Sequence, residues 1–368
     1  MRFPEFTEEW KAEQLDNIAT LSKGIGISKE QLSEDGEPCI LYGELYTKYK
    51  SEIIKQVESK TDINGSKLKR SKANDVIIPC SGETAVDIAT ARCVPFDNIL
   101  FGGDLNVISL HQYDGAFMSY QLNGKRKYDI ARVAQGVSIV HLYGEHLKAI
   151  KTYNPTLPEQ QKIAKLLSLL DDRIDTQNKI IEKLQSLIKG LRVCCMQRVY
   201  GNNVYLSEIA QIYQPQTISS TELTEDGFLV YGANGIIGKY KDYNHETEQI
   251  CITCRGNTCG MVNYTKPMSW ITGNAMVINT DKYQDKVCKR YLYHYLSAYN
   301  FNSIISGSGQ PQIVRTPLEK LKITLPTISE QKQKAMILDK VQDKIEINHN
   351  ILNLYILQKQ YLLRQMFI

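Results

Sequence analysis

Three cysteines in the second half of the chain come nearest to the spacing of a metal site. Cys251 and Cys254 are separated by two residues, as in a zinc-binding pair, and Cys259 follows them. A fourth ligand at a proper spacing is missing, and the six histidines show no ligand spacing. The segment 250–253 is also typical of a strand. We therefore expect no metal site.

Motifs for nucleotide binding and methyl transfer are incomplete. A P-loop needs Gly-x4-Gly-Lys-Ser/Thr, which Gly124-Lys125-Arg126 and Gly238-Lys239-Tyr240 both lack. A methyltransferase that acts on adenine would need an Asn/Asp-Pro-Pro-aromatic strand end. Asn154-Pro155-Thr156 lacks the second proline and the aromatic residue. The sequence therefore predicts a protein without catalytic residues of its own.

Basic and polar loops flanked by glycine are the remaining candidates for a functional surface. Clustered Lys and Arg side chains neutralise phosphates, and Arg and Gln can pair with guanine and adenine in the major groove. The alternative for each cluster is an ordinary solvated loop. The candidates for DNA contact are Lys67, Lys69, Arg70, Lys72, Lys125, Arg126 and Lys127 in the first half, and Lys239, Tyr240, Lys241, Arg255, Gln310 and Gln312 in the second half.

Composition limits the class of protein. The chain has 368 residues, a formal net charge of +4 and a pI near 8.4, which permits a nucleic-acid partner without establishing one. Nine cysteines without framework spacing fit a reducing compartment. No apolar run approaches a membrane span, and the first residues do not resemble a signal peptide. We expect two or three domains in a cytoplasmic protein with no membrane contact.

A long amphipathic segment, 159–195, is the strongest structural pattern. Its apolar residues alternate in steps of four and three, which predicts a helix that packs along its length against another helix. At ~1.5 Å per residue the helix would be roughly 55 Å long. The expected contact positions are Ile163, Leu167, Leu170, Ile174, Gln177, Ile181, Leu184 and Ile188.

The same segment occurs again at 330–366, shifted by 171 residues. Gln177 corresponds to Asn348, so each seam has one polar residue near its midpoint. In an antiparallel pair these amides could hydrogen-bond and fix the register; alternatively, both lie at the edge of the seam in water. The contact positions of the second helix are Leu338, Val341, Ile345, Asn348, Leu352, Tyr355 and Leu362.

Each long helix follows a globular region, and the two globular regions also repeat. Ile40-Leu41-Tyr42-Gly43 corresponds to Leu229-Val230-Tyr231-Gly232, and Ile78-Pro79-Cys80-Ser81-Gly82 to Ile252-Thr253-Cys254-Arg255-Gly256. We expect strands at 39–42, 75–80, 99–101 and 106–110, and short helices at 15–21 and 46–57. The helices match better than the globules, which is typical of two divergent heads on a duplicated scaffold.

Ordered motifs along the chain complete the pattern. They include Arg2-Phe3-Pro4-Glu5-Phe6, Ser81-Gly82-Glu83-Thr84, Gly102-Gly103-Asp104, Pro155 to Gln161 and Leu169-Leu170-Asp171-Asp172-Arg173-Ile174-Asp175. In this order and in duplicate, they resemble the specificity (S) subunit of type I restriction–modification systems over essentially the whole chain. Val193-Cys194-Cys195 departs from that pattern, because the family more often has polar residues before an aromatic residue there.

The resemblance implies a mixed α/β (α+β) fold with internal duplication and pseudo-twofold symmetry. Its expected regions are a target-recognition domain at 1–153, a helical region at 154–198, a second target-recognition domain at 199–325 and a second helical region at 326–368. The two helices would pack as an antiparallel coiled coil that sets the spacer of a bipartite site in double-stranded DNA.

The resemblance also implies partners. Two modification (methyltransferase) subunits would methylate adenine at N6, and restriction subunits would complete an ATP-dependent nuclease. The subunit itself would be no enzyme and would bind no cofactor, because S-adenosylmethionine, ATP and magnesium belong to the partner subunits. The alternative is a non-catalytic coiled-coil scaffold that binds only proteins. A scaffold would not need basic, glycine-flanked loops in both heads.

Overall fold

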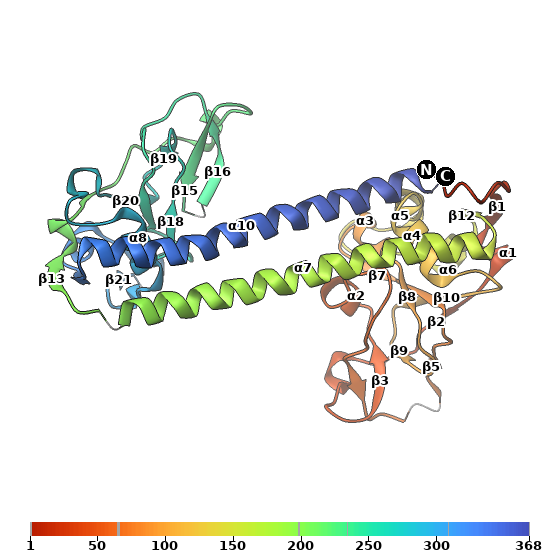
Figure 1. The fold of residues 1–368 in the computed structure, drawn as a ribbon. Coiled ribbons are helices and arrows are strands. Elements are labelled where there is room, and N and C mark those ends of the chain that lie inside the picture. Colours follow the sequence, from red (N-terminus) through yellow and green to blue (C-terminus); the bar gives the residue numbers. More distant parts are fainter. Residues whose placement is uncertain (1, 65–66, 198, 234, 308, 368) are drawn as a thin grey trace. The chain divides into compact units, whose positions relative to one another are not determined.

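The computed structural model describes residues 2–64, 67–197, 199–233, 235–307 and 309–367, without the side chains of 196 and 197. Ser66, which precedes the basic segment that starts at Lys67, and Ser308, which precedes Gln310, lie outside these ranges. The chain divides into two compact units (Figure 1). Unit 1 contains 1–178 and 350–368, and unit 2 contains 179–349. The four predicted regions are consecutive segments of sequence, whereas the two units are defined by packing and each contains parts of both long helices. The four-region division therefore stays a prediction.

Unit 1 is built on a four-stranded antiparallel sheet with the strand order β2-β10-β6-β8. Smaller sheets pair β1 with β12, β11 with β7, and β4, β3, β9 and β5 in that order. The strands are β1 (Lys11–Gln14), β2 (Ala19–Lys23), β3 (Glu37–Ile40), β4 (Lys60–Thr61), β5 (Lys69–Arg70), β6 (Asp75–Pro79), β7 (Ser81–Gly82), β8 (Arg92–Val94), β9 (Leu100–Phe101), β10 (Leu105–Leu110), β11 (Val140–His141) and β12 (Lys151–Asn154).

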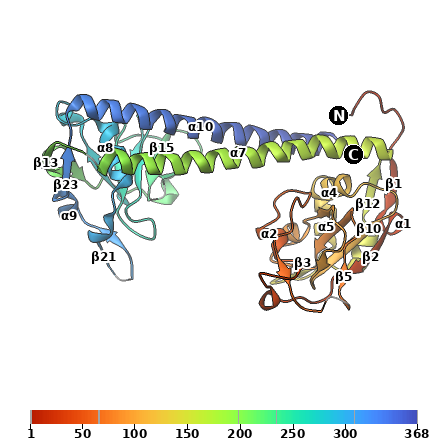
Figure 2. The same ribbon diagram turned by 60° about the horizontal axis from the view of Figure 1, so that its bottom comes forward.

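One helix of unit 1, α4 (Gly115–Asn123), forms a layer between the sheet and the first half of the long helix α7 (Leu157–Gln197) (Figure 2). Its Met118 and Leu122 pack on the sheet, and its Phe117 and Tyr120 pack on the long helix. The other short helices are α1 (Leu15–Ile18), α2 (Glu44–Thr47), α3 (Ala85–Ile88), α5 (Lys127–Val133) and α6 (Gly144–Lys148).

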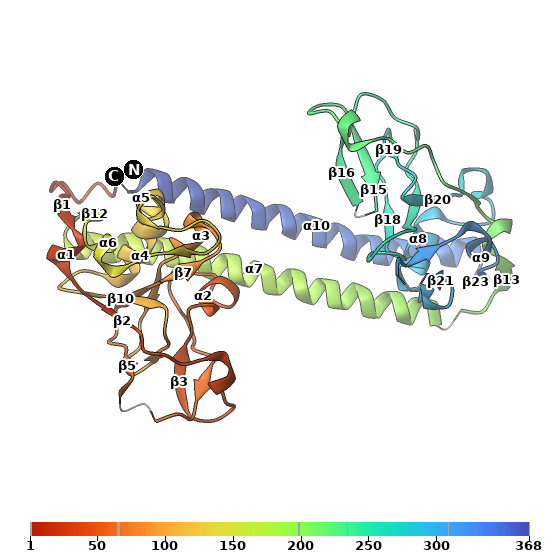
Figure 3. The same ribbon diagram turned by 180° about the vertical axis from the view of Figure 1, so that it is seen from behind.

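Unit 2 repeats this topology, with the sheet order β14-β20-β17-β18. Its strand β13 pairs with β23, and the two lie side by side in Figure 3. Smaller sheets join β16, β15 and β19, and β21 with β22. The elements are β13 (Asn202–Tyr205), β14 (Gln211–Tyr213), β15 (Phe228–Gly232), β16 (Gly235–Tyr240), β17 (Ile250–Thr253), β18 (Val262–Tyr264), β19 (Trp270–Ile271), β20 (Ala275–Asn279), β21 (Ile305–Ser306), β22 (Gln312–Ile313), β23 (Lys322–Leu325), α8 (Lys289–Ala298) and α9 (Arg315–Glu319).

The second long helix is α10 (Ile328–Gln365). In unit 1 the beginning of α7 packs on the end of α10, where Ile163 and Leu167 share a buried cluster with Leu362. In unit 2 the end of α7 meets the beginning of α10, where Ile188 packs with Leu338. The two helices therefore run antiparallel in each unit. The fold is mixed α/β, with two heads of the same strand order and a pair of long helices, as predicted.

Two of the predicted short helices are wrong in extent. The helix expected at 15–21 ends at Ile18, and Ala19–Lys23 is strand β2 instead. The helix expected at 46–57 is reduced to Glu44–Thr47, because Glu52 and Lys55 leave it to pair with charged residues of the long helices. Across the described ranges, no helix has the length and apolar content needed to cross a membrane.

Candidate nucleic-acid interface

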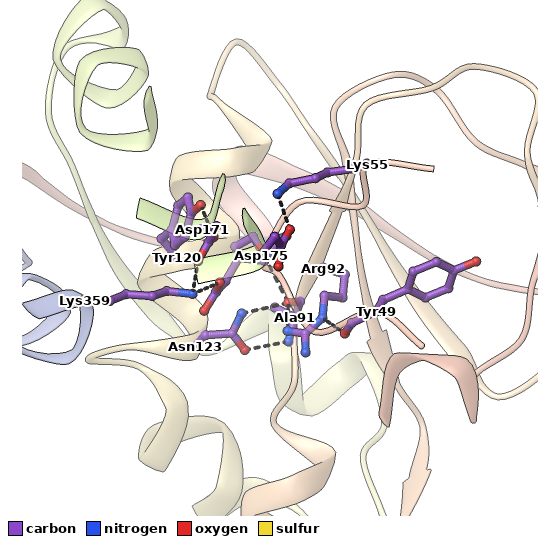
Figure 4. A network of polar contacts seen from close by, with 11 residues as sticks. Tyr49, Lys55, Ala91, Arg92, Tyr120, Asn123, Asp171, Asp175 and Lys359 are labelled. Carbon is purple, nitrogen blue, oxygen red and sulfur yellow. Dashed lines mark hydrogen bonds and ion pairs between the residues drawn. The ribbon is translucent and has the colours of Figure 1, made fainter. Parts of the chain in front are cut away.

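A buried ionic cluster attaches the head of unit 1 to its helices (Figure 4). Lys359 on α10 lies 2.5 Å from Glu52 of the head and 2.6 Å from Asp171 on α7. The hydroxyl of Tyr120 on α4 donates to Asp171 at 2.7 Å. The side chain of Lys359 is 15% exposed, and those of Glu52, Asp171 and Tyr120 are buried. The cluster therefore joins the head to both α7 and α10 through side chains.

Charge and burial oppose each other in this cluster. Burial raises the pKa of the Asp171 carboxyl, and the charge of Lys359 pulls that pKa back down. Burial lowers the pKa of Lys359, but Glu52 and Asp171 outweigh it, so the pKa of Lys359 is raised overall. Lys359 thus stays protonated and contacts both buried carboxylates directly.

Unit 2 has an equivalent joint with different chemistry. His294 on α8 is fully buried, with Nε2 2.8 Å from Asp339 of α10 and Nδ1 3.1 Å from Nε of Arg192 on α7. A guanidinium only donates, so Nδ1 accepts from Arg192 and Nε2–H donates to Asp339. Arg290 Nε donates to the same carboxylate at 2.8 Å. The geometry therefore holds a neutral imidazole between two arginines.

We expect acid to loosen this joint. Burial lowers the pKa of His294 below its ordinary 6.5, although Asp339 acts in the opposite direction. The unfolded chain therefore binds this proton first, so the stabilising contribution is complete above pH 6.5 and is lost as the pH falls below it. The His294→Gln variant should show a flatter loss of unit 2 stability between neutral pH and pH 5. Asp339, whose pKa is lowered below 3.8, contributes only at more acidic pH.

The measurement is urea unfolding followed by tryptophan fluorescence. The chain has two tryptophans, Trp10 in unit 1 and Trp270 in unit 2, so a Trp10→Phe background reports on unit 2 alone. Glutamine keeps a donor for Asp339 and an acceptor for Arg192 but cannot be protonated. An equally steep pH dependence in the His294→Gln variant would show that the imidazole does not control the joint.

A pair of glutamines makes the same connection in both units. Gln160 Nε2 donates to the Pro155 carbonyl at 2.8 Å, and its Oε1 accepts from the backbone N–H of Asp114, just before α4. Gln331 bonds in the same manner to the Pro326 carbonyl, at 2.9 Å, and to the N–H of Cys288, just before α8. The start of each long helix is thereby tied to the helix of its own head.

The basic segment of the first head lies beside a polar cavity. Lys69 and Lys72 line a cavity of about 330 Å³, together with Thr20 and His111, whose side chains are 2.8 Å apart. The neighbouring Arg70 is held by Glu37 through hydrogen bonds of 2.6 and 3.0 Å, and Lys67 is exposed. Asp75 also lines the cavity, but it is buried and its carboxylate accepts from the Lys72 N–H at 2.9 Å. The two lysines and the histidine suit an anionic oxygen such as a DNA phosphate.

The second basic segment of this head is not beside the first (Figures 1 and 3). Lys125 to Lys127 turn from α4 into α5, where Gly124 lies against Leu363 near the end of α10. Arg126 pairs with Asp129 at 3.0 Å and stacks over Tyr153, whereas Lys125 is exposed. This segment therefore belongs to the helix end of unit 1, and β5 to the opposite end of the head.

The candidates in the second head form two groups. Lys239 and Tyr240 end β16, where Lys239 pairs with Asp226 at 3.4 Å and Tyr240 packs edge-on against Trp270. Lys241 follows and is exposed. Figures 1 and 3 place β16 away from β21, the strand that pairs with β22. The structure therefore does not bring this group together with the second.

The second group consists of Arg255, Gln310 and Gln312. Arg255 forms a β-bridge with Gln312, and the N–H of Gly256 donates to the Pro311 carbonyl at 3.0 Å. All three side chains of the group are exposed. Among the residues that the structure describes, no carboxylate pairs with Arg255, unlike Arg70. One guanidinium and two amides are thus presented together at the end of β17.

The seam residues of the long helices are buried or half-buried. Gln177 is 7% exposed and Asn348 9% exposed, but they belong to different units, so the predicted amide pair stays a prediction. Asn348 Nδ2 donates to the carbonyl of Lys344 at 2.6 Å. The buried seam positions are Ile163, Leu167, Leu170, Ile181, Ile188, Leu338, Ile345 and Leu362, and the half-buried ones are Ile174, Leu184, Val341, Leu352 and Tyr355.

The cysteines do not converge on a metal. Cys251 lies on β17 and Cys254 directly follows it, and the two side chains lie in different hydrophobic clusters because residues three apart along an extended chain face opposite sides of the sheet. Burial raises the pKa of Cys251 to about 12, which disfavours the thiolate that zinc requires. In the described part of the chain, no three His, Cys, Asp or Glu side chains are arranged to hold a metal ion.

Comparison with known proteins matches this architecture to one family. The family model of the type I restriction modification DNA specificity domain matches residues 7–186 and 202–354, one copy for each head with its following helix. The chain belongs to this family. Both copies of the specificity domain include a head and most of a long helix, so the family domain itself is the duplicated element.

Individual relatives of this family cover the chain to different extents. The EcoprrI specificity subunit of Escherichia coli is 32% identical over 39% of this chain and 36% of its own length. The MjaVIII specificity subunit of Methanocaldococcus jannaschii is 25% identical over 92% of this chain and 88% of its own length. A solved S subunit from M. genitalium has the same fold, with a TM-score of 0.69 over the whole chain at 17% identity.

Two sets of residues that organise these specificity domains are not visible in the sequence. The first set consists of the residues that join each head to the long helices, such as Lys359 and His294. The second is the segment around β11, which pairs with β7. Neither set has a recognisable sequence motif. The glutamine pair is different, because Gln160 and Gln331 fall at corresponding positions of the two repeated helices. This repetition is the sequence feature that points to a repeated contact between each long helix and its head.

Proposed function

We propose that this chain is the DNA-specificity subunit of a type I restriction–modification complex. Each head reads one half of a bipartite site in double-stranded DNA, and the helix pair sets the spacer between the halves. The observation that carries the proposal is the combination of a shared backbone with different polar surfaces. The two heads have the same strand order, but the first presents Lys69 and Lys72 beside a cavity and the second presents Arg255 with Gln312.

The partners follow from this role. Two modification subunits supply S-adenosylmethionine-dependent methylation of adenine, and restriction subunits supply ATP-dependent cleavage, so this subunit contributes recognition and assembly but no reacting group. Exposed apolar residues on the long helices support the docking of further subunits, since such side chains are costly in water. They include Leu169, Ile180, Leu187, Met336, Ile337, Leu354 and Leu357.

The test is to co-express the chain with its modification subunit and to map methylated adenines in the host DNA. We expect a new motif of two short specified blocks around a fixed spacer. A protein-binding scaffold, by contrast, would form a complex without adding methylation. If a complex forms and no new methylation appears, the DNA-specificity role is wrong.

A charge-removal variant tests the cavity of the first head. Replacing Lys69 and Lys72 by alanine should weaken DNA binding by the complex on all sequences, because phosphate contacts carry no sequence information. Each lost contact should reduce the slope of log K against log salt by about 0.9. The readout is fluorescence anisotropy at several salt concentrations. The matched control is Lys29→Ala/Lys50→Ala, two exposed lysines of the same head, and an equal loss in the control would contradict the assignment.

The histidine of this cavity is replaced by a paired aspartate in the second head. Ile108 pairs with Leu21 in the first sheet as Ile278 pairs with Ile212 in the second, so His111 corresponds to Asp281. Asp281 is already paired with Lys289 at 2.6 Å. The equivalent place in unit 2 therefore carries a neutralised carboxylate. We expect phosphate contacts to differ between the two heads.

A further inference from the structure

Two hairpins of equal length occupy equivalent places in the two units. In unit 1 the backbones of Gln135 and His141 exchange hydrogen bonds of 2.9 and 2.7 Å. In unit 2 Ser306 pairs with Gln312. We call the segments 135–141 and 306–312 the first and the second hairpin.

The hairpins are attached to their sheets by the same bond. The residue after the first hairpin, Leu142, donates its N–H to the carbonyl of Cys80 at 2.9 Å. The residue after the second hairpin, Ile313, donates to the carbonyl of Cys254 at 3.0 Å. Cys80 and Cys254 end corresponding strands, so the second hairpin lies beside Arg255 and the first beside Ser81.

A glycine at the second position preserves the backbone of both hairpins. Gly136 has a φ of +121° and Gly307 a φ of +91°, in the region that other residues rarely adopt. A Cβ at Gly136 would clash with the Ile139 carbonyl, and one at Gly307 with the Gln310 carbonyl, three residues further on in each case. Both hairpins therefore keep a glycine of positive φ at the same position, close to the carbonyl three residues further on, although their other residues differ; Ser308 of the second hairpin lies outside the described residues.

The side chains that the hairpins expose are different. The first hairpin presents Val137, which is 97% exposed, and Ile139, which is 60% exposed. The second presents the amides of Gln310 and Gln312 next to Arg255. Two branched apolar side chains at a projecting turn are unfavourable in water and suit a surface that will be covered. Two domains that recognise different DNA sequences need different exposed side chains on a similar backbone, and the two hairpins fit this description.

Local charge favours base edges over the DNA backbone at the first hairpin. Ser138 and Ile139 line a cavity of about 700 Å³ together with Glu83, Asp87 and Arg92. Arg92 is buried and donates to the Tyr49 and Ala91 carbonyls, whereas Glu83 and Asp87 are exposed, so the accessible charge is that of the two carboxylates. Carboxylates repel phosphates, but they can accept a hydrogen bond from the amino group of cytosine. The lysines that suit phosphates lie elsewhere, beside the cavity that contains Lys69 and Lys72. The surface that suits DNA phosphates and the surface that suits base edges therefore lie on separate parts of this head.

We infer that the two hairpins are the base-reading elements of the heads and enter the major groove of the two half-sites. Val137 and Ile139 contact the C5-methyl groups of thymines. Gln310, Gln312 and Arg255 hydrogen-bond to the edges of adenine and guanine, for which amides and guanidinium groups have the matching donors and acceptors. The inference rests on the proposed function, because it assigns the bases read by an already DNA-specific subunit.

The first experiment exchanges the chemistry of one hairpin. The Val137→Ser/Ile139→Gln double variant is co-expressed with the modification subunit, and methylated adenines are mapped. We expect one half of the bipartite motif to change or become degenerate, with the other half and the spacer unchanged. The control is Ile25→Ser, another exposed apolar residue of the same head, which should leave the motif unchanged. If the wild type yields a motif and the double variant yields the same motif, the hairpin assignment fails while the proposed function stands.

The second experiment changes the DNA instead of the protein. Deoxyuridine replaces thymine in one half-site at a time, which removes only the methyl group. We expect the wild-type complex to lose about fourfold in affinity for each buried methyl, and only in the half-site of the first head. The double variant should lose nothing on the same substitution. An equal response of both proteins, or a half-site of the first head without thymine, would overturn the methyl contact.

Discussion

Replacing Lys359 by alanine is expected to destabilise unit 1 by about 3–5 kcal/mol, because it leaves two buried carboxylates without their shared cation. Glu52 and Asp171 side chains are only 9% and 5% exposed, so water cannot replace the lost ammonium group. The measurement is urea unfolding of a Trp270→Phe background, in which Trp10 reports on unit 1. Trp10 packs against Phe117, on the helix that also carries Tyr120, and against Phe367.

The matched control for this prediction is Lys344→Ala, an exposed lysine on the same helix. It should change the stability of either unit by no more than about 0.5 kcal/mol. A second variant, Lys359→Met with Asp171→Asn and Glu52→Gln, removes all three charges and should recover part of the loss, since uncharged partners tolerate burial better. A Lys359→Ala variant as stable as the wild type would show that the cluster does not hold the head.

Replacing Leu338 by alanine is expected to destabilise unit 2 by about 2–5 kcal/mol. Leu338 is completely buried and packs with Ile188 and Ile345 in the cluster between the two long helices. Alanine removes the transfer free energy of the side chain and leaves a cavity that two helices fixed at both ends cannot close. Fluorescence of Trp270 in the Trp10→Phe background reports the unfolding midpoint.

The neighbouring residue supplies the control. Ile337 lies one position earlier on the same helix and is 50% exposed. The Ile337→Ala variant should cost little in the isolated chain, and it should weaken binding of the modification subunit if that face is covered in the complex. Equal destabilisation by both variants would mean that the heptad seam is not the packing surface of the helix pair.

The long helices could be predicted from the sequence because their pattern is long and repeated. Ile163, Leu167 and Leu170 recur at the spacing of a helical seam, and the copy at 330–366 repeats the pattern. Short elements gave weaker signals. Gly115 and Gly124 are residues typical of breaks between strands, but Gly115 begins helix α4 and Gly124 follows its last residue. Asp114 caps the first turn of this helix by accepting from the Phe117 N–H at 2.7 Å.

The candidate interface was only partly predictable from the sequence, because which basic side chains are available depends on ion pairs with residues that are distant in the sequence. The sequence marks Arg70 as basic, but only the structure shows that Glu37 already holds it. The first hairpin has no turn motif in 135–141 beyond Gly136, and the segments that join each hairpin to Leu147 and Leu321 differ in length. That difference hid the equivalence with 306–312, although Gln310 and Gln312 themselves were recognised from their side-chain types.

The division of the helices between the units has a consequence for synthesis on the ribosome. Unit 2 is one continuous stretch of chain, so it can close as soon as His349 has left the exit tunnel. Unit 1 is discontinuous, and its core of Ile163 and Leu167 is completed by Leu362, which is translated much later. The first head emerges first but finishes last, and its apolar helix face stays uncovered during that interval. Exposed apolar surface on a partly folded chain favours aggregation, so we expect the nascent N-terminal half to be the stage at which a chaperone or a partner subunit would act.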